Sequence, residues 1–320
     1  MIVQRCSLTF ELTPSNILRL RRQPVYIETK INCDLDTLWL YTQNPALHQQ
    51  WDLRFSEIKY LPKNNPSEPQ RFLYSTKIGS GIKVNGIGES VATKTKSNGE
   101  STSVLKFSSN SQTSIIREGS GYWKYIPEAD GIKFFTGYDY ESRWGWFGKV
   151  FDKFIFRPLI IWATAWSFDC LKKWIENGLH PEQAIKAQLT ILFSSIALGL
   201  VWIYQGLVPK LLFTDTGELE LIKQSGFFQG NEKNVLALFG TAEIIFGFII
   251  LLVQRKSVHV INILALLLLA IAALISNAVV FTFPFNPFSL SISMIALSII
   301  AIINFRNLPK ASNCITKQKQ

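Results

Sequence analysis

The sequence predicts an α+β soluble domain followed by an all-α bundle of four transmembrane helices. In residues 25–142, short runs that alternate apolar and polar side chains are separated by turn residues, which is typical of an antiparallel sheet. In residues 187–305, four long apolar segments each approach the roughly 20 residues that a helix needs to cross a bilayer. The 320-residue chain is long enough for two such domains.

The chain is basic, with a formal net charge of +10 that divides as +6 up to Lys186 and +4 beyond it. No stretch combines clustered Lys and Arg with interleaved aromatic residues, so we expect no nucleic-acid partner. A mild attraction to the anionic headgroups of a membrane lipid bilayer explains the charge more simply.

The four cysteines are scattered, and no two of them have the CxxC spacing of a zinc or dithiol site. We therefore predict no metal site and no cofactor. No apolar signal-peptide segment follows the first residues, Met1 to Ser7. We accordingly expect the soluble domain to stay in the cytoplasm, where it is made.

The soluble domain is expected to begin, after a leader at residues 1–23, with a strand at residues 25–31. Asp34 or Asp36 can cap the helix that follows, because a short acidic side chain accepts hydrogen bonds from the first free backbone N–H groups. A second short helix follows Asn44-Pro45 and ends near Trp51.

Six strands and a long helix complete the domain. The strands are expected at residues 54–61, 71–78, 87–94, 103–107, 114–125 and 132–142, and the short turns between them predict an antiparallel meander. The helix covers residues 149–177, with Pro158 marking a kink or a break and Gly178 as its stop. Its apolar face can only be buried against the sheet.

One strand, two small helices, six strands and a long C-terminal helix make up the layout of the START-like, or polyketide-cyclase-like (SRPBCC), helix-grip superfamily, which residues 24–178 resemble. Leu38-Trp39, Asn44-Pro45 and Trp51 resemble the pattern common around its two small helices. The resemblance implies a curved sheet that grips a helix, with a cavity between them that often holds an apolar ligand.

The aromatic residues of this domain are either ordinary core or the lining of that cavity. A buried phenol needs a hydrogen-bond partner, which a ligand or water can supply, so tyrosines on the inward face favour a cavity. The candidate ligand-binding residues are Trp39, Trp51, Phe72, Tyr74, Phe134, Tyr138 and Tyr140. No Ser/His/Asp or Cys/His arrangement accompanies them, and His48, beside two glutamines, is expected on the surface of the second helix.

The four apolar segments are residues 187–208, 235–253, 260–283 and 288–305, and Glu243 is their one charged residue. Helices buried in a soluble bundle alternate apolar and polar faces every 3.6 residues, whereas residues 261–271 show no polar face. These segments therefore predict a membrane domain at residues 187–305, joined to the soluble domain by a linker at residues 179–186.

Several spaced motifs in residues 190–305 resemble the DoxX-like four-helix membrane family. They are Trp202, Gly206-Leu207-Val208-Pro209-Lys210, Glu218, Gly240-Thr241-Ala242-Glu243, Gly247, Asn286-Pro287-Phe288 and Met294. The resemblance implies mostly architecture, although some more distant relatives are membrane subunits associated with quinone or thiol redox chemistry. The region has no cysteine apart from Cys314 in the tail, which argues against thiol chemistry.

Glu243 needs a partner, since an ionisable group in a membrane span costs a few kcal/mol. It is either a proton-carrying or ligand-binding carboxylate approached by Lys210, or part of a polar contact with Gln205 and Asn277 that fixes helix packing. The membrane-domain candidates are Gln205, Lys210, Glu218, Glu243 and Asn286. Asn286-Pro287 is expected to be a turn at the interface.

The distribution of charge predicts the topology. The loop between the second and third spans and the basic tail, residues 306–320, hold six basic residues and no acidic ones. The loop between the first and second spans holds three lysines among four acidic residues. Because positive charge near span ends marks the cytoplasmic side, we expect both termini in the cytoplasm of a bacterial cell, with the spans in its inner membrane.

These observations predict a membrane-anchored binding protein in which a cytoplasmic helix-grip cavity binds an apolar or amphipathic small molecule. Two alternatives stay open: a membrane subunit of a quinone-linked redox system in which Glu243 moves protons, and a structural membrane anchor or interaction module. Whether the chain catalyses a reaction is not encoded in a recognisable motif.

Overall fold

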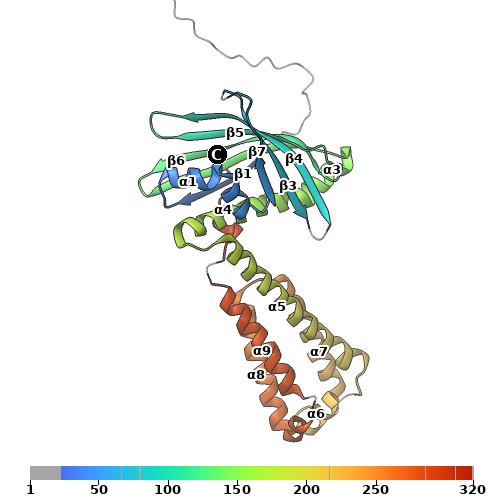
Figure 1. Cartoon of the computed structure of the whole chain (residues 1–320). Helices are drawn as coiled ribbons and strands as arrows, with labels where there is room; N and C mark the ends of the chain where they lie inside the picture. Colours follow the sequence, from blue (N-terminus) through green and yellow to red (C-terminus); the bar gives the residue numbers. More distant parts are fainter. Residues whose placement is uncertain are drawn as a thin grey trace, which may run out of the picture. The chain divides into compact units, whose positions relative to one another are not determined.

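The computed structural model describes residues 23–65, 67–78, 81–215, 217–284, 286–306 and 308–318. Contacts divide the chain into two compact units, the first formed by residues 1–168 and 311–320 and the second by residues 169–310. The first unit is an α+β helix-grip fold and the second is all-α, which confirms the predicted fold class (Figure 1). The predicted leader lies outside the described residues, apart from Gln23.

The first unit is built on one seven-stranded antiparallel sheet with the order β1-β7-β6-β5-β4-β3-β2. Strand β1 (Val25–Ile31) is followed by two short helices, α1 (Leu35–Gln43) and α2 (Pro45–Trp51). The remaining strands are β2 (Glu57–Tyr60), β3 (Gln70–Ile78), β4 (Ile82–Thr95), β5 (Ser101–Ser108), β6 (Ile116–Glu128) and β7 (Gly131–Ser142). Strands β2 to β7 form the predicted meander, and β1 joins it beside β7.

Local signals explain the two short helices. The Asp34 carboxylate accepts a hydrogen bond from the backbone N–H of Thr37 at 2.7 Å and so caps α1. The Asn44 side chain caps α2, and Pro45 occupies its first turn, where a missing N–H is harmless.

The concave face of the sheet carries aromatic rings that lie over glycines of the neighbouring strand. Strand pairing sets Phe72 opposite Gly88 and Tyr74 opposite Gly86. A Cβ atom at either glycine would come within 2.1 Å of the facing ring, so only glycine fits there. The glycines of β4 thus let these rings lie flat across the strand.

A continuous helix over Gly145–Asn177 lies along this concave face (Figure 1). It consists of α3 (Gly145–Phe151), a π-turn η2 (Asp152–Phe156) and α4 (Arg157–Asn177). The π-turn precedes Pro158, where the missing N–H interrupts the regular hydrogen-bond ladder, and the helix continues through Pro158 without the predicted break. Phe168 of α4 stacks on Phe134 of β7, with ring centroids 4.6 Å apart.

The end of the chain returns to the first unit. After a short 3-10 helix η5 (Ala311–Asn313), the backbone of Ile315 pairs with Glu28 of β1 through two hydrogen bonds of 2.9 Å. The buried Cys314 thiol donates a hydrogen bond to the Ala165 carbonyl. The residues predicted as a separate basic tail are therefore, from Ala311 onward, part of the helix-grip unit.

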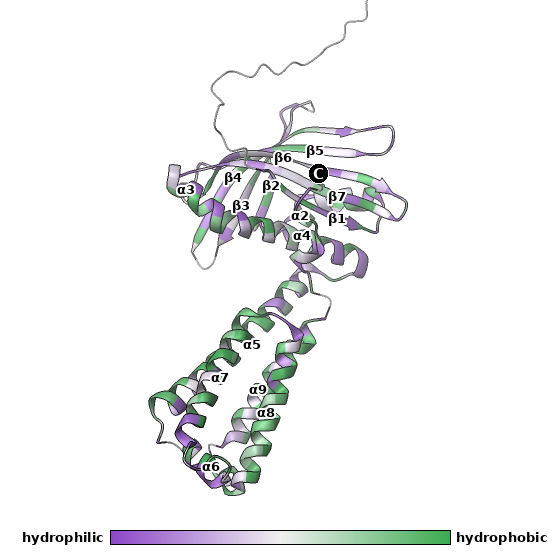
Figure 2. Ribbon diagram, turned by 180° about the vertical axis from the view of Figure 1, so that it is seen from behind, coloured by the Kyte–Doolittle hydropathy of each residue, from purple (hydrophilic) through white to green (hydrophobic). Residues whose placement is uncertain are grey.

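The second unit is a helical bundle whose helices are apolar along most of their length (Figure 2). Its elements are α5 (Pro181–Leu207), the π-turn η3 (Val208–Leu212), α6 (Gly217–Ser225), α7 (Glu232–Leu252), α8 (Lys256–Ser276), the 3-10 helix η4 (Ala278–Thr282) and α9 (Pro287–Asn304). Helices α5, α7, α8 and α9 are each long and apolar enough to cross a membrane, and each overlaps one predicted span.

Two predicted boundaries in this unit are wrong. The linker expected at residues 179–186 is helical from Pro181, because His180 caps α5 and Pro181 fits the first helical turn. The third span was expected to reach Phe283, but α8 ends at Ser276. There the Asn277 side chain accepts a hydrogen bond from the N–H of Val279 and starts a short 3-10 helix instead.

Helices α5 and α7 approach each other closely at glycines. A Cβ atom at Gly206 would lie 2.3 Å from the Gly240 carbonyl oxygen, and one at Gly247 would lie 2.8 Å from the Gly199 carbonyl oxygen. Small residues at such positions allow two helix backbones to come together in a bilayer, where helices pack by van der Waals contact. This close contact brings together the charged side chains described below.

Candidate functional site

The helix-grip unit contains a buried set of charged and polar groups formed by His48, Asp52 and Arg54. The Arg54 guanidinium donates two hydrogen bonds to the Asp52 carboxylate, at 2.8 and 2.6 Å. His48 Nε2 lies 3.0 Å from the second carboxylate oxygen. Asp52 is fully buried, whereas the side chains of His48 and Arg54 are 13% and 15% exposed.

Burial and charge together set the protonation of this set. Burial raises the pKa of Asp52, but the Coulombic attraction and hydrogen bonds of Arg54 outweigh it and hold that pKa below its ordinary value. Burial lowers the pKa of His48, and the nearby Asp52 carboxylate only partly offsets this effect. The set is therefore an Arg54–Asp52 ion pair beside a neutral imidazole.

His48 was predicted to be a surface residue, and this prediction is wrong. Its ring packs between aromatic side chains, with ring centroids 5.0 Å from Trp51, 5.3 Å from Phe55 and 4.9 Å from Trp123. The neighbouring glutamines suggested a solvated helix, but the i,i+4 spacing of His48 and Asp52 turns both toward the sheet.

Several predicted cavity residues belong to the packed core. Trp51 and Phe134 are completely buried, and both contact the ring of Phe168. Trp39 is half-buried against Tyr125, with ring centroids 5.1 Å apart. The rings of Trp51 and Phe134 thus fill the space around Phe168 between the sheet and the helix.

The two buried phenols of β7 have protein partners, so neither needs a ligand or water to satisfy its hydroxyl group. The hydroxyl of Tyr138 shares a hydrogen bond of 3.0 Å with that of Thr164, and the hydroxyl of Tyr140 donates to the Asp152 carboxylate. Helix residues that the sequence pattern did not single out thus satisfy both groups.

The other predicted aromatics, Phe72 and Tyr74, lie outside the packed core. The rings of Phe72 and Tyr74 are only half-buried on the concave face, and Tyr74 contacts Phe55 at 5.5 Å. The Arg54 guanidinium carbon lies 5.5 Å from the Phe55 ring and 5.6 Å from the Tyr138 ring. The structure therefore places the Arg54 guanidinium, which the sequence analysis missed, beside Phe55 and Tyr138, and Tyr74 reaches it only through Phe55.

A groove is lined by residues of strands β3 to β7 together with Lys149, Lys153 and Arg157 of the helix that follows β7. Its volume is about 1350 Å³, and of the predicted cavity residues only Tyr140 lines it. Strand pairing aligns one row of its lining across five strands: Arg71, Glu89, Lys106, Ser120 and Asp139. Alternating charges on an open face are adequately explained by cross-strand pairing in water.

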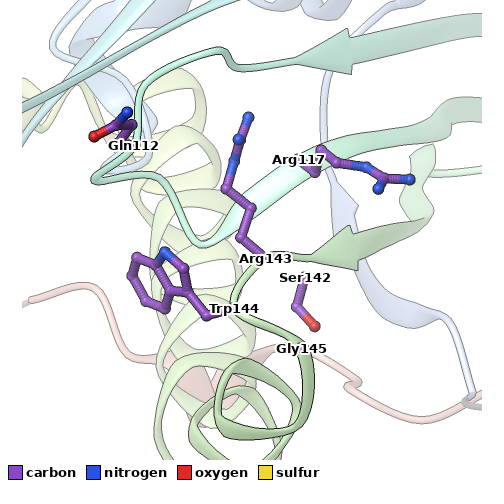
Figure 3. A pocket seen from close by; sticks show the side chains of 6 residues that line it. All are labelled: Gln112, Arg117, Ser142, Arg143, Trp144 and Gly145. Atoms are coloured by element: carbon purple, nitrogen blue, oxygen red, sulfur yellow. The ribbon is translucent and has the colours of Figure 1, made fainter.

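A second hollow, of about 650 Å³, is lined by Gln112, Arg117, Ser142, Arg143, Trp144 and Gly145 at the end of β7 (Figure 3). The Arg143 guanidinium donates to the Ser109 carbonyl, and the Arg117 guanidinium pairs with Glu141. Both cations are thus engaged by the protein itself.

The bundle holds a three-membered charge cluster at Lys210, Glu218 and Glu243. The Lys210 ammonium lies 2.6 Å from a carboxylate oxygen of Glu218 and 2.8 Å from one of Glu243. The side chain of Lys210 is 8% exposed and that of Glu243 is 12% exposed. The expected approach of Lys210 to Glu243 is therefore present, and the π-turn η3 that carries Lys210 follows directly on α5.

The other membrane-domain candidates have different roles in the structure. The Lys210 ammonium donates a hydrogen bond of 3.3 Å to the backbone carbonyl of Gln205, so the contact does not use the Gln205 side chain. Asn277 donates to Gln224 at 3.0 Å, so its expected contact with Glu243 is wrong. Asn286 caps α9 by accepting hydrogen bonds from the backbone N–H groups of Phe288 and Ser289, as a turn residue does.

A second buried polar set in the bundle escaped the sequence analysis. The indole N–H of Trp202 on α5 donates to the Asn262 side chain on α8 at 2.6 Å. Asn262 in turn donates to the hydroxyl of Ser298 on α9 at 2.7 Å. All three side chains are buried and joined to one another, so they fix the packing of three helices.

Metal binding has no recognisable site in the part of the chain that the structure describes, where no three His, Cys, Asp or Glu residues cluster as ligands would.

A helix-grip domain that continues into a bundle of apolar helices with a buried charge cluster defines a class of membrane protein, and comparison with known sequences identifies it. Residues 199–299 match the DoxX-like family. The protein named "Uncharacterized membrane protein YndG" of Bacillus subtilis (strain 168) is 46% identical over 205 residues, which is 63% of this chain and 76% of that protein. The chain belongs to the membrane protein family that includes YndG.

Solved structures resemble the helix-grip unit at low sequence identity. TTHA0849 from Thermus thermophilus is 15% identical, with a TM-score of 0.36, over 47% of this chain and 94% of that one. A STAR-related lipid transfer protein fragment from Xanthomonas axonopodis is 13% identical, with a TM-score of 0.34, over 46% of this chain and 81% of that one. At these TM-scores we draw nothing further from the likeness.

Proposed function

We propose that the protein is a membrane-anchored binding protein whose helix-grip domain holds an amphipathic molecule with an anionic head group beside Arg54. The observation that carries this proposal is the buried Arg54–Asp52 pair on the same face as the half-buried rings of Phe72 and Tyr74. The head group would meet the guanidinium, and the apolar part would cover the rings.

The energetics of buried ion pairs favour a binding role for this set. Replacing a buried pair by apolar residues of similar volume is often neutral or stabilising, so stability alone is a weak reason to keep one. Arg54 is held in place by a bidentate carboxylate and keeps a 15% exposed side chain. An arginine held in this way can recognise the carboxylate or phosphate of a ligand with little loss of conformational entropy.

The sequence of elements suggests how binding would serve the membrane domain. The helix that lies along the concave face ends at Asn177, and α5 begins at Pro181, so few residues separate the binding face from the first span. The helix-grip domain would either deliver a ligand held on the concave face to the membrane part or signal its presence to that part. We place the helix-grip domain and both termini in the cytoplasm, as the charge distribution predicts.

The test is to measure palmitate binding by the full chain in mild detergent, using native mass spectrometry, for wild type, Arg54→Gln and Arg71→Gln. Arg71 lies on the outward face and is the matched control. We expect Arg54→Gln to bind palmitate about tenfold to 100-fold more weakly, because a hydrogen bond to a charged group contributes about 1.5–3 kcal/mol. Arg71→Gln should bind as wild type does.

Hexadecanol, which has the same chain without the acid, separates a local effect from unfolding. Wild type should prefer palmitate to hexadecanol, and Arg54→Gln should bind both about equally. Equal binding of palmitate by wild type and Arg54→Gln, or no binding by wild type, would reject the proposal. Extraction and mass spectrometry of co-purified lipids, quinones and other small molecules would identify the natural ligand.

A second candidate function, proton transfer by Glu243 in a redox subunit, is favoured by the charge cluster of the bundle. Lys210 pairs with two carboxylates at once, so one of them can gain or lose a proton while the lysine stays paired. Glu243→Gln should then abolish proton uptake into proteoliposomes without impairing folding, whereas the exposed-site control Glu220→Gln should not. If Glu243→Leu instead behaves as wild type does, the cluster serves packing alone.

A further inference from the structure

We propose that the helical segment from Gly145 to Trp162 lies along the surface of the bilayer, with its exposed aromatic side in the headgroup region of anionic lipids. This inference is independent of the binding function proposed above. It assigns the segment, which we call the surface helix, a lipid partner in addition to its packing against the sheet.

The surface helix exposes large apolar side chains over several turns. Trp146 is 79% exposed and Phe154 is 68% exposed. The other members of this apolar side are Phe147, Ile155, Leu159 and Trp162, each at least 49% exposed. Single exposed apolar residues are ordinary, but a contiguous set of this size indicates an interaction surface.

The chemistry of this surface fits a bilayer interface. Tryptophan concentrates at the headgroup level, where its ring is buried and its N–H stays hydrated. Lys149 and Lys153 are exposed on the same segment, and the Lys153 ammonium lies 5.2 Å from the ring centroid of Phe154. Lysines beside an aromatic face match anionic headgroups, with their alkyl stems along the apolar surface and their charges in water.

The surface helix cannot bury its apolar side chains by crossing the membrane. By length and hydropathy, Gly145–Asn177 would qualify as a fifth span. However, Ile315 pairs with Glu28, so the sheet before this helix and the chain end after α9 lie on one side of the membrane. Four later helices already provide an even number of crossings, and a fifth would separate the two paired segments.

Two short stretches of chain join the first unit to helices that are apolar enough to cross a membrane. Only residues 178–180 separate α4 from α5, and only residues 305–310 separate α9 from η5. The surface helix is therefore tethered to the membrane-spanning part of the same chain, whereas a soluble partner would have to be recruited. A covering by lipid accounts for both its aromatic side and its lysines.

The experiment uses a nitroxide at Phe154→Cys in the full chain, reconstituted in vesicles of phosphatidylcholine with phosphatidylglycerol. The background replaces Cys6 and Cys33 by serine, because the other two thiols are buried. Lys106→Cys, exposed on the outward face of the sheet, is the matched control. Collision of each label with oxygen, which concentrates in lipid, is compared with collision with a water-soluble nickel chelate.

We expect the label at Phe154 to collide with oxygen and to lose nearly all collision with nickel, whereas the label at Lys106 should collide readily with nickel. Accessibility to both reagents at Phe154 would mean exposure to water and would overturn the proposal. Protection from both would mean a protein cover, such as a second copy of the chain, and would overturn it as well.

The lysines test the anionic part of the proposal in the same samples. With Lys149→Gln and Lys153→Gln combined, the label should regain nickel accessibility. When the lysines are unchanged, the label should likewise regain nickel accessibility in vesicles of phosphatidylcholine alone. If neither change alters the accessibility, anionic headgroups play no part in holding the helix.

Discussion

Replacing Asp52 by asparagine is the sharpest test of the buried ion pair. The asparagine keeps the shape of the side chain but removes the negative charge that holds Arg54 in a bidentate contact at 2.8 and 2.6 Å. The same carboxylate also receives the contact from His48 at 3.0 Å. One substitution therefore leaves a guanidinium with 15% exposure without its counter-charge.

The expected loss of stability follows from this geometry. Removing one partner of a buried pair costs about 3–5 kcal/mol, since the other charge stays buried and uncompensated. A domain of ordinary stability has about 5–15 kcal/mol in total, so Asp52→Asn should leave the helix-grip unit marginally folded. Glu141→Gln is the control, because Glu141 is 48% exposed and its partner Arg117 is 56% exposed. An exposed pair of this kind contributes at most about 1 kcal/mol.

Hydrogen exchange of the full chain in detergent measures this loss without requiring the two units to unfold together. The slowest amides of β1 and β7 report the opening free energy of the sheet itself. Asp52→Asn should speed their exchange by about two to four orders of magnitude, and Glu141→Gln by less than one. If the exchange of Asp52→Asn stays within tenfold of wild type, Asp52 and Arg54 do not form a strong buried pair.

Three further predictions concern pH, helix packing and topology. Because the pKa of His48 in the folded state lies below 6.5, the unfolded chain takes up the His48 proton at a higher pH than the folded chain does. The protection of the sheet amides from hydrogen exchange should therefore fall as the pH drops below 6.5, and His48→Gln should weaken this pH dependence. Asp52 should lower the stability of the sheet further as the pH falls, but only below its ordinary pKa of 3.8. Gly206→Val should lower the thermal stability of the bundle by separating α5 from α7. Gly217→Ala should leave that stability unchanged, because a Cβ atom at this position has no other atom within 4 Å. Reporter fusions after Gln229 and after Lys310 should report opposite sides of the membrane; a shared side would mean that one of the helices α7, α8 and α9 does not span.

The regular elements could be predicted because their signals are local. The strand at Val25–Ile31 coincides with its predicted range, since alternation, the following Asp34 cap and the Asn44-Pro45 start are all encoded within a few residues. The approach of Lys210 to Glu243 was also anticipated, because a charge in a span has few ways to be compensated.

The features that the sequence analysis missed depend on contacts between distant segments. Arg54 looks like an ordinary residue at the start of a strand, and only its burial near Tyr138 distinguishes it. His48 was misplaced because its ring packs against Trp123, which comes from a distant strand that helix periodicity does not connect to it. The hydroxyl of Tyr138 is satisfied by Thr164, a helix residue with no local signal.

The contact between Ile315 and Glu28 has a consequence for biosynthesis. Strand β1 is an edge of the sheet, and an uncovered edge can pair with other chains. The ribosome makes β1 first and Ile315 only after all four apolar helices, so a nascent helix-grip domain waits with this edge unpaired while the bundle enters the membrane. Its completion depends on a segment that returns only when every helix has inserted in the right direction. A chain with one helix inserted wrongly would keep an open edge, which gives chaperones and proteases a direct way to distinguish it from a correctly inserted chain.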